Sequence, residues 1–172
     1  MCGEKTEGGA NAMILYHGSN VEVRRPRVLT TNRSLDFGAG FYTTSNLDQA
    51  KRWARLQAQR RRSGSALVSV YEINEAVFES LSLLRFERAN AAWLDFVVEN
   101  RKGLYQGALY DIVIEPVAND RTMSVINDYM NDQIDRETAL ILLKPQNLSD
   151  QYRFGTEKAL RYLSCEEVML LD

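Results

Sequence analysis

The 172-residue chain has few of the residues that mark whole classes of protein: two cysteines, three prolines and one histidine. Cys2 and Cys165 lie near opposite ends of the chain, so neither a disulfide framework nor a Cys-x-x-Cys metal site is available. No apolar run approaches the roughly 20 residues that span a bilayer, and the start lacks the basic-then-apolar pattern of a signal peptide. We therefore predict no metal, no membrane partner and a cytoplasmic location.

Net charge and chain length limit the remaining classes of protein and the number of domains. A net charge of -2 argues against an obligate nucleic-acid binder. With 45% hydrophobic residues, the chain fits one compact domain. Residues 1–12 are polar and rich in glycine, so we expect a disordered leader or an expression remnant there and a single domain over 13–172.

Hydrophobic patterning predicts strands and helices in an irregular order. The strands are predicted at 14–16, 41–44, 66–73, 81–86, 110–117, 151–154 and 167–171. The helices are predicted at 45–60, 87–100, 120–131, 136–143 and 156–163. Ser45 and Asp48 have the form of a capping pair for the first helix. Without regular βαβ repetition, the order favours an α+β fold with a curved, largely antiparallel sheet core.

The residues that suggest chemistry gather early in the chain. His17, the only histidine, lies at a predicted strand end and is followed by Gly18. A glycine lets a ligand approach the backbone, so Gly18 can offer its N–H and C=O to a flat primary carboxamide. A second glycine pair, Gly38 and Gly40, precedes the next strand. Such short motifs are weak evidence, and glycines that only make turns remain an alternative.

Two aromatic residues strengthen the functional interpretation. Tyr42 lies in the strand after Gly40, and Trp53 lies on the helix that follows. Two rings can sandwich a cationic ring, with a cation–π attraction of about 0.5–2 kcal/mol. Each ring taken alone is more typical of a core residue, because aromatic side chains bury large areas wherever they occur. Together with His17, the pair predicts a site for a planar, sugar-bearing ligand.

In this order the motifs resemble the NAD-binding core of ADP-ribosyltransferases of the diphtheria toxin and poly(ADP-ribose) polymerase type. The stretches YHGS, DFGAGFYTT and YDIVIEPVAND resemble more closely a bacterial family of small, largely uncharacterised domains placed in that superfamily. This resemblance runs from about residue 13 to the C-terminus. It implies an ADP-ribosyltransferase-like fold with a split, largely antiparallel β core and flanking helices.

The resemblance also implies a role for each residue. His17 would bind the adenosine-side ribose, and the Gly18 backbone would hold the nicotinamide carboxamide. Tyr42 would stack on the nicotinamide ring, and Trp53 would close the opposite face. The helix position that carries a carboxamide-binding serine in the polymerase-like enzymes is Ala50 here, which puts one amide contact in doubt.

The third catalytic position decides whether the site can do chemistry. The implied catalytic set is His17, Tyr42 and Gln151, and Ser19 and Gly40 complete the NAD-binding set. The family places a glutamate where Gln151 stands, because a carboxylate stabilises the positive charge that develops on the ribose. A neutral amide cannot do this fully, and losing one such electrostatic element costs about 10²- to 10³-fold in rate.

Four other carboxylates are candidates to supply the missing charge: Asp111, Glu115, Asp120 and Glu157. Isolated carboxylates are usually exposed, so we expect solvated surface charges at these positions. Asp120, with Arg121, is expected at a helix N-terminus that could face the pyrophosphate or an acceptor.

A basic patch allows a nucleic acid as well as a protein to be the acceptor. Cations cluster along and after the first predicted helix, at Lys51, Arg52, Arg55, Arg60, Arg61 and Arg62. They could engage the phosphates of NAD or of a nucleic acid. A solvated helix face, with cations favoured at the helix end by the macrodipole, explains the same pattern.

The sequence therefore predicts a mono-ADP-ribosyltransferase that uses NAD as substrate and modifies an unknown protein or nucleic-acid acceptor. The alternative is a non-catalytic domain that binds NAD or ADP-ribose, or a protein partner, after losing the glutamate. A toxin with a neutralising partner protein is a third hypothesis.

Overall fold

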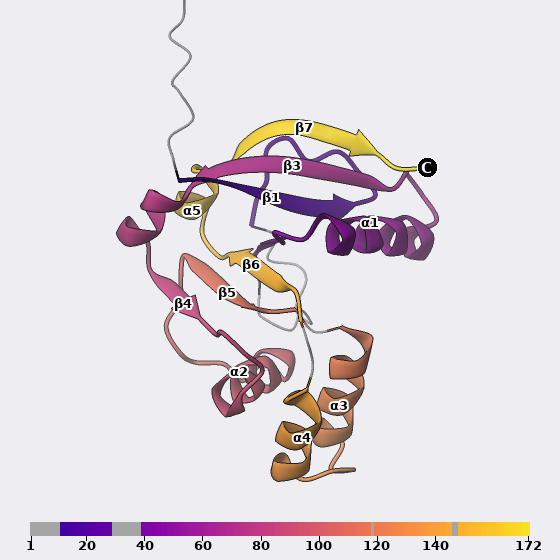
Figure 1. Ribbon diagram of the computed structural model, residues 1–172, viewed down its shortest axis with the longest axis vertical. Coiled ribbons are helices and arrows are strands. Elements are labelled where there is room, and N and C mark those ends of the chain that lie inside the picture. Colours follow the sequence, from indigo (N-terminus) through magenta and orange to yellow (C-terminus); the bar gives the residue numbers. More distant parts are fainter. Residues whose placement is uncertain (1–10, 29–38, 118, 146–147) are drawn as a thin grey trace, which may run out of the picture.

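The computed structural model describes residues 11–28, 39–117, 119–145 and 148–172. These residues form a single small α+β domain with two sheets, as the patterning predicts (Figure 1). The predictions for residues 1–10 and for Gly38 lie outside the described residues. None of the described helices is long and apolar enough to cross a membrane.

The first sheet is antiparallel, with β3 in its centre and α1 (Leu47–Arg61) packed against one face. Its strands are β1 (Ala12–Ser19), β3 (Leu67–Asn74) and β7 (Ser164–Leu170). Val68 and Val70 of β3 pack with Ala50 and Ala54 of α1 in one buried cluster. The alternate residue Tyr71 packs on the other face, so the apolar run of β3 is covered on both sides as expected.

The second sheet has the order β2-β6-β5-β4 and is antiparallel except for the parallel pair β4 and β5. Its strands are β2 (Phe41–Thr43), β4 (Leu83–Arg85), β5 (Ile112–Pro116) and β6 (Asp150–Phe154). Pro116 ends β5, which is compatible with its missing N–H. The split, largely antiparallel core is therefore present as two sheets.

The remaining helices differ in their position relative to the second sheet. They are the 3₁₀ helix η1 (Glu75–Ser80), α2 (Ala91–Arg101), α3 (Asp120–Met130), α4 (Arg136–Leu143) and α5 (Glu157–Leu160). η1 and α5 pack with the side chains between the two sheets, whereas α2, α3 and α4 lie on the other face of the second sheet. The predicted capping pair of α1 is wrong. Asn46 caps this helix by accepting a hydrogen bond from the Gln49 N–H (3.1 Å). Ser45 instead donates its hydroxyl to Asp150 (2.6 Å) and links α1 to β6.

Two buried clusters divide the faces of the second sheet. The inter-sheet cluster contains side chains from both sheets, including Leu15, Phe41, Tyr71 and Phe154. The helix-side cluster packs the other face against α2, α3 and α4 around Trp93. Side chains that alternate along β2, β5 and β6 therefore enter different environments.

Candidate functional site

The predicted site residues lie where the two sheets part. A single backbone bridge joins β1 to the chain after β2: the Tyr16 N–H donates to the Thr44 carbonyl (2.8 Å), and the Thr44 N–H donates to the Tyr16 carbonyl (2.9 Å). His17 and Gly18 follow the bridge on β1, and Tyr42 precedes it on β2. The structure therefore brings these three residues to one junction.

His17 connects the two sheets. Its Nδ1 donates a hydrogen bond to the Tyr42 carbonyl (2.6 Å), and its ring packs on Phe41 with centroids 4.3 Å apart. Because a carbonyl only accepts, the proton belongs on Nδ1, and Nε2 carries a lone pair. Burial lowers the pKa of His17, against the opposing effect of the hydrogen bond. Nε2 has no hydrogen-bond partner among the described residues, so it can accept from a ligand hydroxyl.

Gly18 is held inside β1 and does not form a turn. The N–H and C=O of Tyr16 both pair with Thr44 and therefore point away from β3. Tyr16 is thus a non-hydrogen-bonded position in the ladder between β1 and β3. By alternation Gly18 is another, so its N–H and C=O point to the same outer edge, beyond the bridge. A Cβ at Gly18 would lie 2.0 Å from the Ala50 carbonyl oxygen. Only glycine lets α1 approach β1 this closely.

Tyr42 and Gln151 share one face of the second sheet. Tyr42 is opposite Arg153 in the register, and Gln151 lies two residues before Arg153 on β6. The Tyr42 side chain packs against the helix-side cluster, whereas Phe41 enters the inter-sheet cluster. The His17 ring, which packs on Phe41, and the Tyr42 side chain therefore lie on opposite faces of β2 and are linked through the Tyr42 carbonyl.

The remaining predicted residues lie on β1, on α1 and just before β2. Trp53 is half-buried on α1 and makes no ring contact with an aromatic of the described chain. Ser19 ends β1, and its hydroxyl accepts a hydrogen bond from the Val21 N–H (3.4 Å). Ala50 is fully buried, so the helix presents a methyl group where the resemblance implies a serine. A Cβ at Gly40 would lie 2.7 Å from Arg153 Cγ.

Two of the candidate carboxylates are not solvated, and that prediction is wrong for them. Glu115 is 1% exposed and lies directly opposite Gln151 in the register of β5 and β6. Asp111 is buried and accepts hydrogen bonds from the Thr156 hydroxyl (2.6 Å) and the Ser82 N–H (3.0 Å). Both belong to the central strand β5 or its start, where helices and strands exclude water.

The other two carboxylates differ. Glu157 is exposed, as expected, and its carboxylate accepts from the Val28 N–H (3.0 Å). Asp120 begins α3, as predicted, and its side chain lies outside the described residues.

Sequence reasoning missed a buried cation beside these groups. Arg153 is 4% exposed, and its Nη1 donates to the Ala39 carbonyl (3.0 Å). The alternation of polar and apolar residues along β6 places Gln151 and Arg153 on one face, and this pattern was the available signal. By contrast, the basic patch of α1 is largely exposed, with Arg52 donating to Gln49 (2.7 Å).

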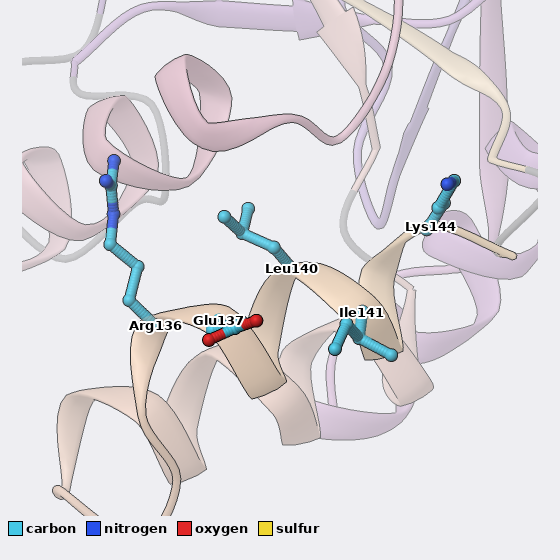
Figure 2. A pocket seen from close by; sticks show the side chains of 5 residues that line it. All are labelled: Arg136, Glu137, Leu140, Ile141 and Lys144. Atoms are coloured by element: carbon cyan, nitrogen blue, oxygen red, sulfur yellow. The ribbon is translucent and has the colours of Figure 1, made fainter.

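A surface hollow lies elsewhere, on α4 at the opposite end of the molecule from β1 (Figures 1 and 2). It has a volume of about 420 Å³ and is lined by Arg136, Glu137, Leu140, Ile141 and Lys144. It contains none of the predicted site residues. Within the described ranges, no three metal-ligating side chains gather.

Together these features define a small α+β domain whose two sheets part at a His–Gly strand edge. The chain belongs to the family described as "Protein of unknown function (DUF3990)", whose model matches residues 13–165. No curated protein matches the chain. The family description names no activity.

Proposed function

We propose that the protein is a mono-ADP-ribosyltransferase that binds NAD⁺ where the two sheets part and transfers ADP-ribose to a macromolecular acceptor. The observation that carries this proposal is the direction of the Gly18 backbone groups at the outer edge of β1. Its outward N–H and C=O form the donor and acceptor pair that a primary carboxamide requires.

His17 supports the same ligand. Its Nδ1–H is committed to the Tyr42 carbonyl, so the neutral imidazole offers Nε2 as an acceptor one residue from Gly18. A ribose hydroxyl can donate to this atom. Because burial lowers the pKa of His17, the acceptor form is the stable one at neutral pH. Trp53 is half-buried on α1, the helix that packs against β1, and is the candidate for stacking on the ligand ring.

The reaction would break the bond between the ribose C1′ and the nicotinamide nitrogen. Nicotinamide leaves with the bonding electrons, positive charge develops on the ribose, and an acceptor nucleophile bonds to C1′ and loses its proton. Gln151 cannot neutralise that charge, but Glu115 lies opposite it in the register. A carboxylate in this low-dielectric position acts over a longer range than one in water.

Binding and its residues can be tested directly. Calorimetry should detect NAD⁺ binding to the wild type, and His17→Ala and Tyr42→Ala should each weaken it by about tenfold or more, as for a lost hydrogen bond or stacking contact. Arg161→Met, at the exposed C-cap residue of α5, serves as the control. If the wild type does not bind NAD⁺, the proposal should be dropped.

Gln151 favours a second candidate, a non-catalytic domain that binds NAD or ADP-ribose. Incubation with labelled NAD⁺ separates the two. Released nicotinamide or a labelled acceptor supports the transferase, whereas saturable binding without turnover supports the sensor. The acceptor, protein or nucleic acid, and any neutralising partner would be sought by recovering the labelled macromolecule.

A swap of the facing pair tests the electrostatic requirement. In Gln151→Glu combined with Glu115→Gln, the single carboxylate moves to the position that the resemblance assigns to it. We expect nicotinamide release to rise by about 10²- to 10³-fold over the wild type. An unchanged rate with intact NAD⁺ binding would mean that the site lacks more than a charge.

A further inference from the structure

Arg153 is a charged residue in the interior of a sheet. It lies in the middle of β6, with Tyr42 opposite it on one side and Val113 on the other. The residue is 4% exposed. A guanidinium is always protonated in proteins and offers five N–H donors, so this position holds a full positive charge away from water.

The hydrogen-bond partners of this guanidinium do not compensate the cost of burying its charge. Nη1 donates to the neutral Ala39 carbonyl (3.0 Å). Nε is buried and has no hydrogen-bond partner in the described part of the chain. No carboxylate of the described residues lies within salt-bridge distance of Arg153. Buried charges are normally paired, because desolvation without a counter-charge is costly.

The neighbouring backbone is shaped around this side chain. A Cβ at Gly40 would lie 2.7 Å from Arg153 Cγ. At the other end, a Cβ at Gly155 would lie 3.0 Å from Nη1 and 2.6 Å from the Tyr110 carbonyl oxygen. Two glycines therefore leave the room that the arginine occupies. The backbone therefore holds the arginine side chain in one position, whereas a solvent-exposed side chain would not need this space.

We propose that Arg153 is an anion receptor for a phosphate-bearing ligand. Its planar fork binds a phosphate through two N–H groups, which a neutral carbonyl cannot match. Without ligand, one of these N–H groups donates to the Ala39 carbonyl. On binding, the phosphate would replace this carbonyl as the acceptor. In the proposed function, which this inference deepens, the anion is the pyrophosphate of NAD⁺, with Tyr42 beside it on the same sheet face.

The test compares ligands with and without phosphate on the same variants. Calorimetry would measure NAD⁺, ADP, pyrophosphate and nicotinamide on the wild type, Arg153→Met and the exposed control Arg161→Met. We expect Arg153→Met to weaken NAD⁺, ADP and pyrophosphate by about 10- to 100-fold, the range of a lost charged hydrogen bond. Nicotinamide should bind both proteins equally, and Arg161→Met should behave as the wild type.

The outcomes separate this inference from the proposed function. Equal NAD⁺ affinity of the wild type and Arg153→Met overturns the anion receptor and leaves the transferase standing. If the wild type binds pyrophosphate and ADP through Arg153 but binds no NAD⁺, the receptor stands and the transferase falls. Failure of every phosphate ligand to bind at millimolar concentration overturns the receptor.

A second measurement covers the case in which Arg153→Met does not fold. Arg153→Lys keeps the charge and loses the planar fork. Millimolar pyrophosphate should raise the melting temperature of the wild type above that in sodium chloride of equal ionic strength. The rise in melting temperature should be smaller in Arg153→Lys, because the lysine cannot bind the phosphate through two N–H groups. Equal rises in both proteins would show ordinary ionic stabilisation and overturn the proposal.

Discussion

On the β2-β6-β5-β4 sheet, one face packs against the first sheet and the other faces α2, α3 and α4. The same strands supply both faces. Tyr152 and Phe154 of β6 enter the inter-sheet cluster, whereas Gln151 and Arg153 lie on the helix side. Both faces exclude water and carry a hydrophobic cluster, but the helix-side face also holds an amide, a cation and the carboxylate of Glu115.

The two faces contribute differently to stability and to the candidate site. Apolar side chains hold two sheets together at no electrostatic cost, and any well-packed replacement would do the same. Buried charges usually give no net stability over apolar residues of similar size. Under the proposed function, the polar residues of the helix-side face serve binding and catalysis, whereas the inter-sheet face serves folding. Substitutions on the two faces should differ in which property they change.

Phe154→Ala should have the largest effect on stability. The side chain is fully buried between the sheets, so truncation leaves a cavity and should cost about 3–5 kcal/mol of unfolding free energy. Urea denaturation followed by circular dichroism measures it. Leu170→Ala, at a side chain 69% exposed, should cost under about 0.5 kcal/mol. A cost for Phe154→Ala below about 1 kcal/mol would mean that this face is not the structural one.

On the polar face, Gln151→Glu should destabilise the protein through Glu115. The variant places two carboxylates opposite each other in a buried register, where like charges raise a carboxyl pKa and oppose folding. Adding Glu115→Gln should remove the repulsion. We expect a coupling energy of about 2 kcal/mol from the four unfolding free energies at pH 7. Additive effects within about 0.5 kcal/mol would contradict this pairing.

The local elements could largely be predicted from the sequence. Helical periodicity gives α4 over 136–143, and apolar runs give the strands to within two or three residues, because these patterns depend on near neighbours. The cap at Asn46 and the short η1 were missed. Asn46 competes with Ser45, and the choice depends on the tertiary contact between Ser45 and Asp150.

The site could be predicted only where its signal is local. A glycine after a strand-end histidine indicates close approach of another group, and Gly18 does lie against Ala50. The facing of Glu115 and Gln151 depends on strand order and register between distant segments. A lone charged residue in a strand also suggests a solvated face. Only the helices over the second sheet make Arg153 and Glu115 buried residues.

Asp111 sharpens the comparison, because it is a buried carboxylate whose hydrogen bonds are those of a structural group. The Thr156 hydroxyl, followed by the Ser82 backbone and side chain, lowers the pKa of Asp111 against the effect of burial. Asp111→Asn should cost about 1 kcal/mol at pH 7, since one acceptor and the charge are lost. NAD⁺ affinity should not change.

The pH dependence of this variant follows from the same shift. A carboxyl with a lowered folded pKa stabilises the protein above its unfolded pKa of about 3.9, and the stability is lost as the pH falls through the folded value. Asp111→Asn should therefore lose less stability than the wild type between about pH 4 and the acid transition. Equal losses in both proteins would assign the acid sensitivity to other carboxyls.

The smallest effect belongs to His17, which links the two faces through the Tyr42 carbonyl. Because burial lowers its pKa, the unfolded chain takes up this proton first, so stability should fall as the pH drops from about 6.5 towards the folded value. One proton gives a slope of at most about 1.4 kcal/mol per pH unit. His17 is the only histidine, so His17→Gln should remove the slope in urea denaturation between pH 7 and 5. If the slope persists in His17→Gln, protonation of His17 is not its cause.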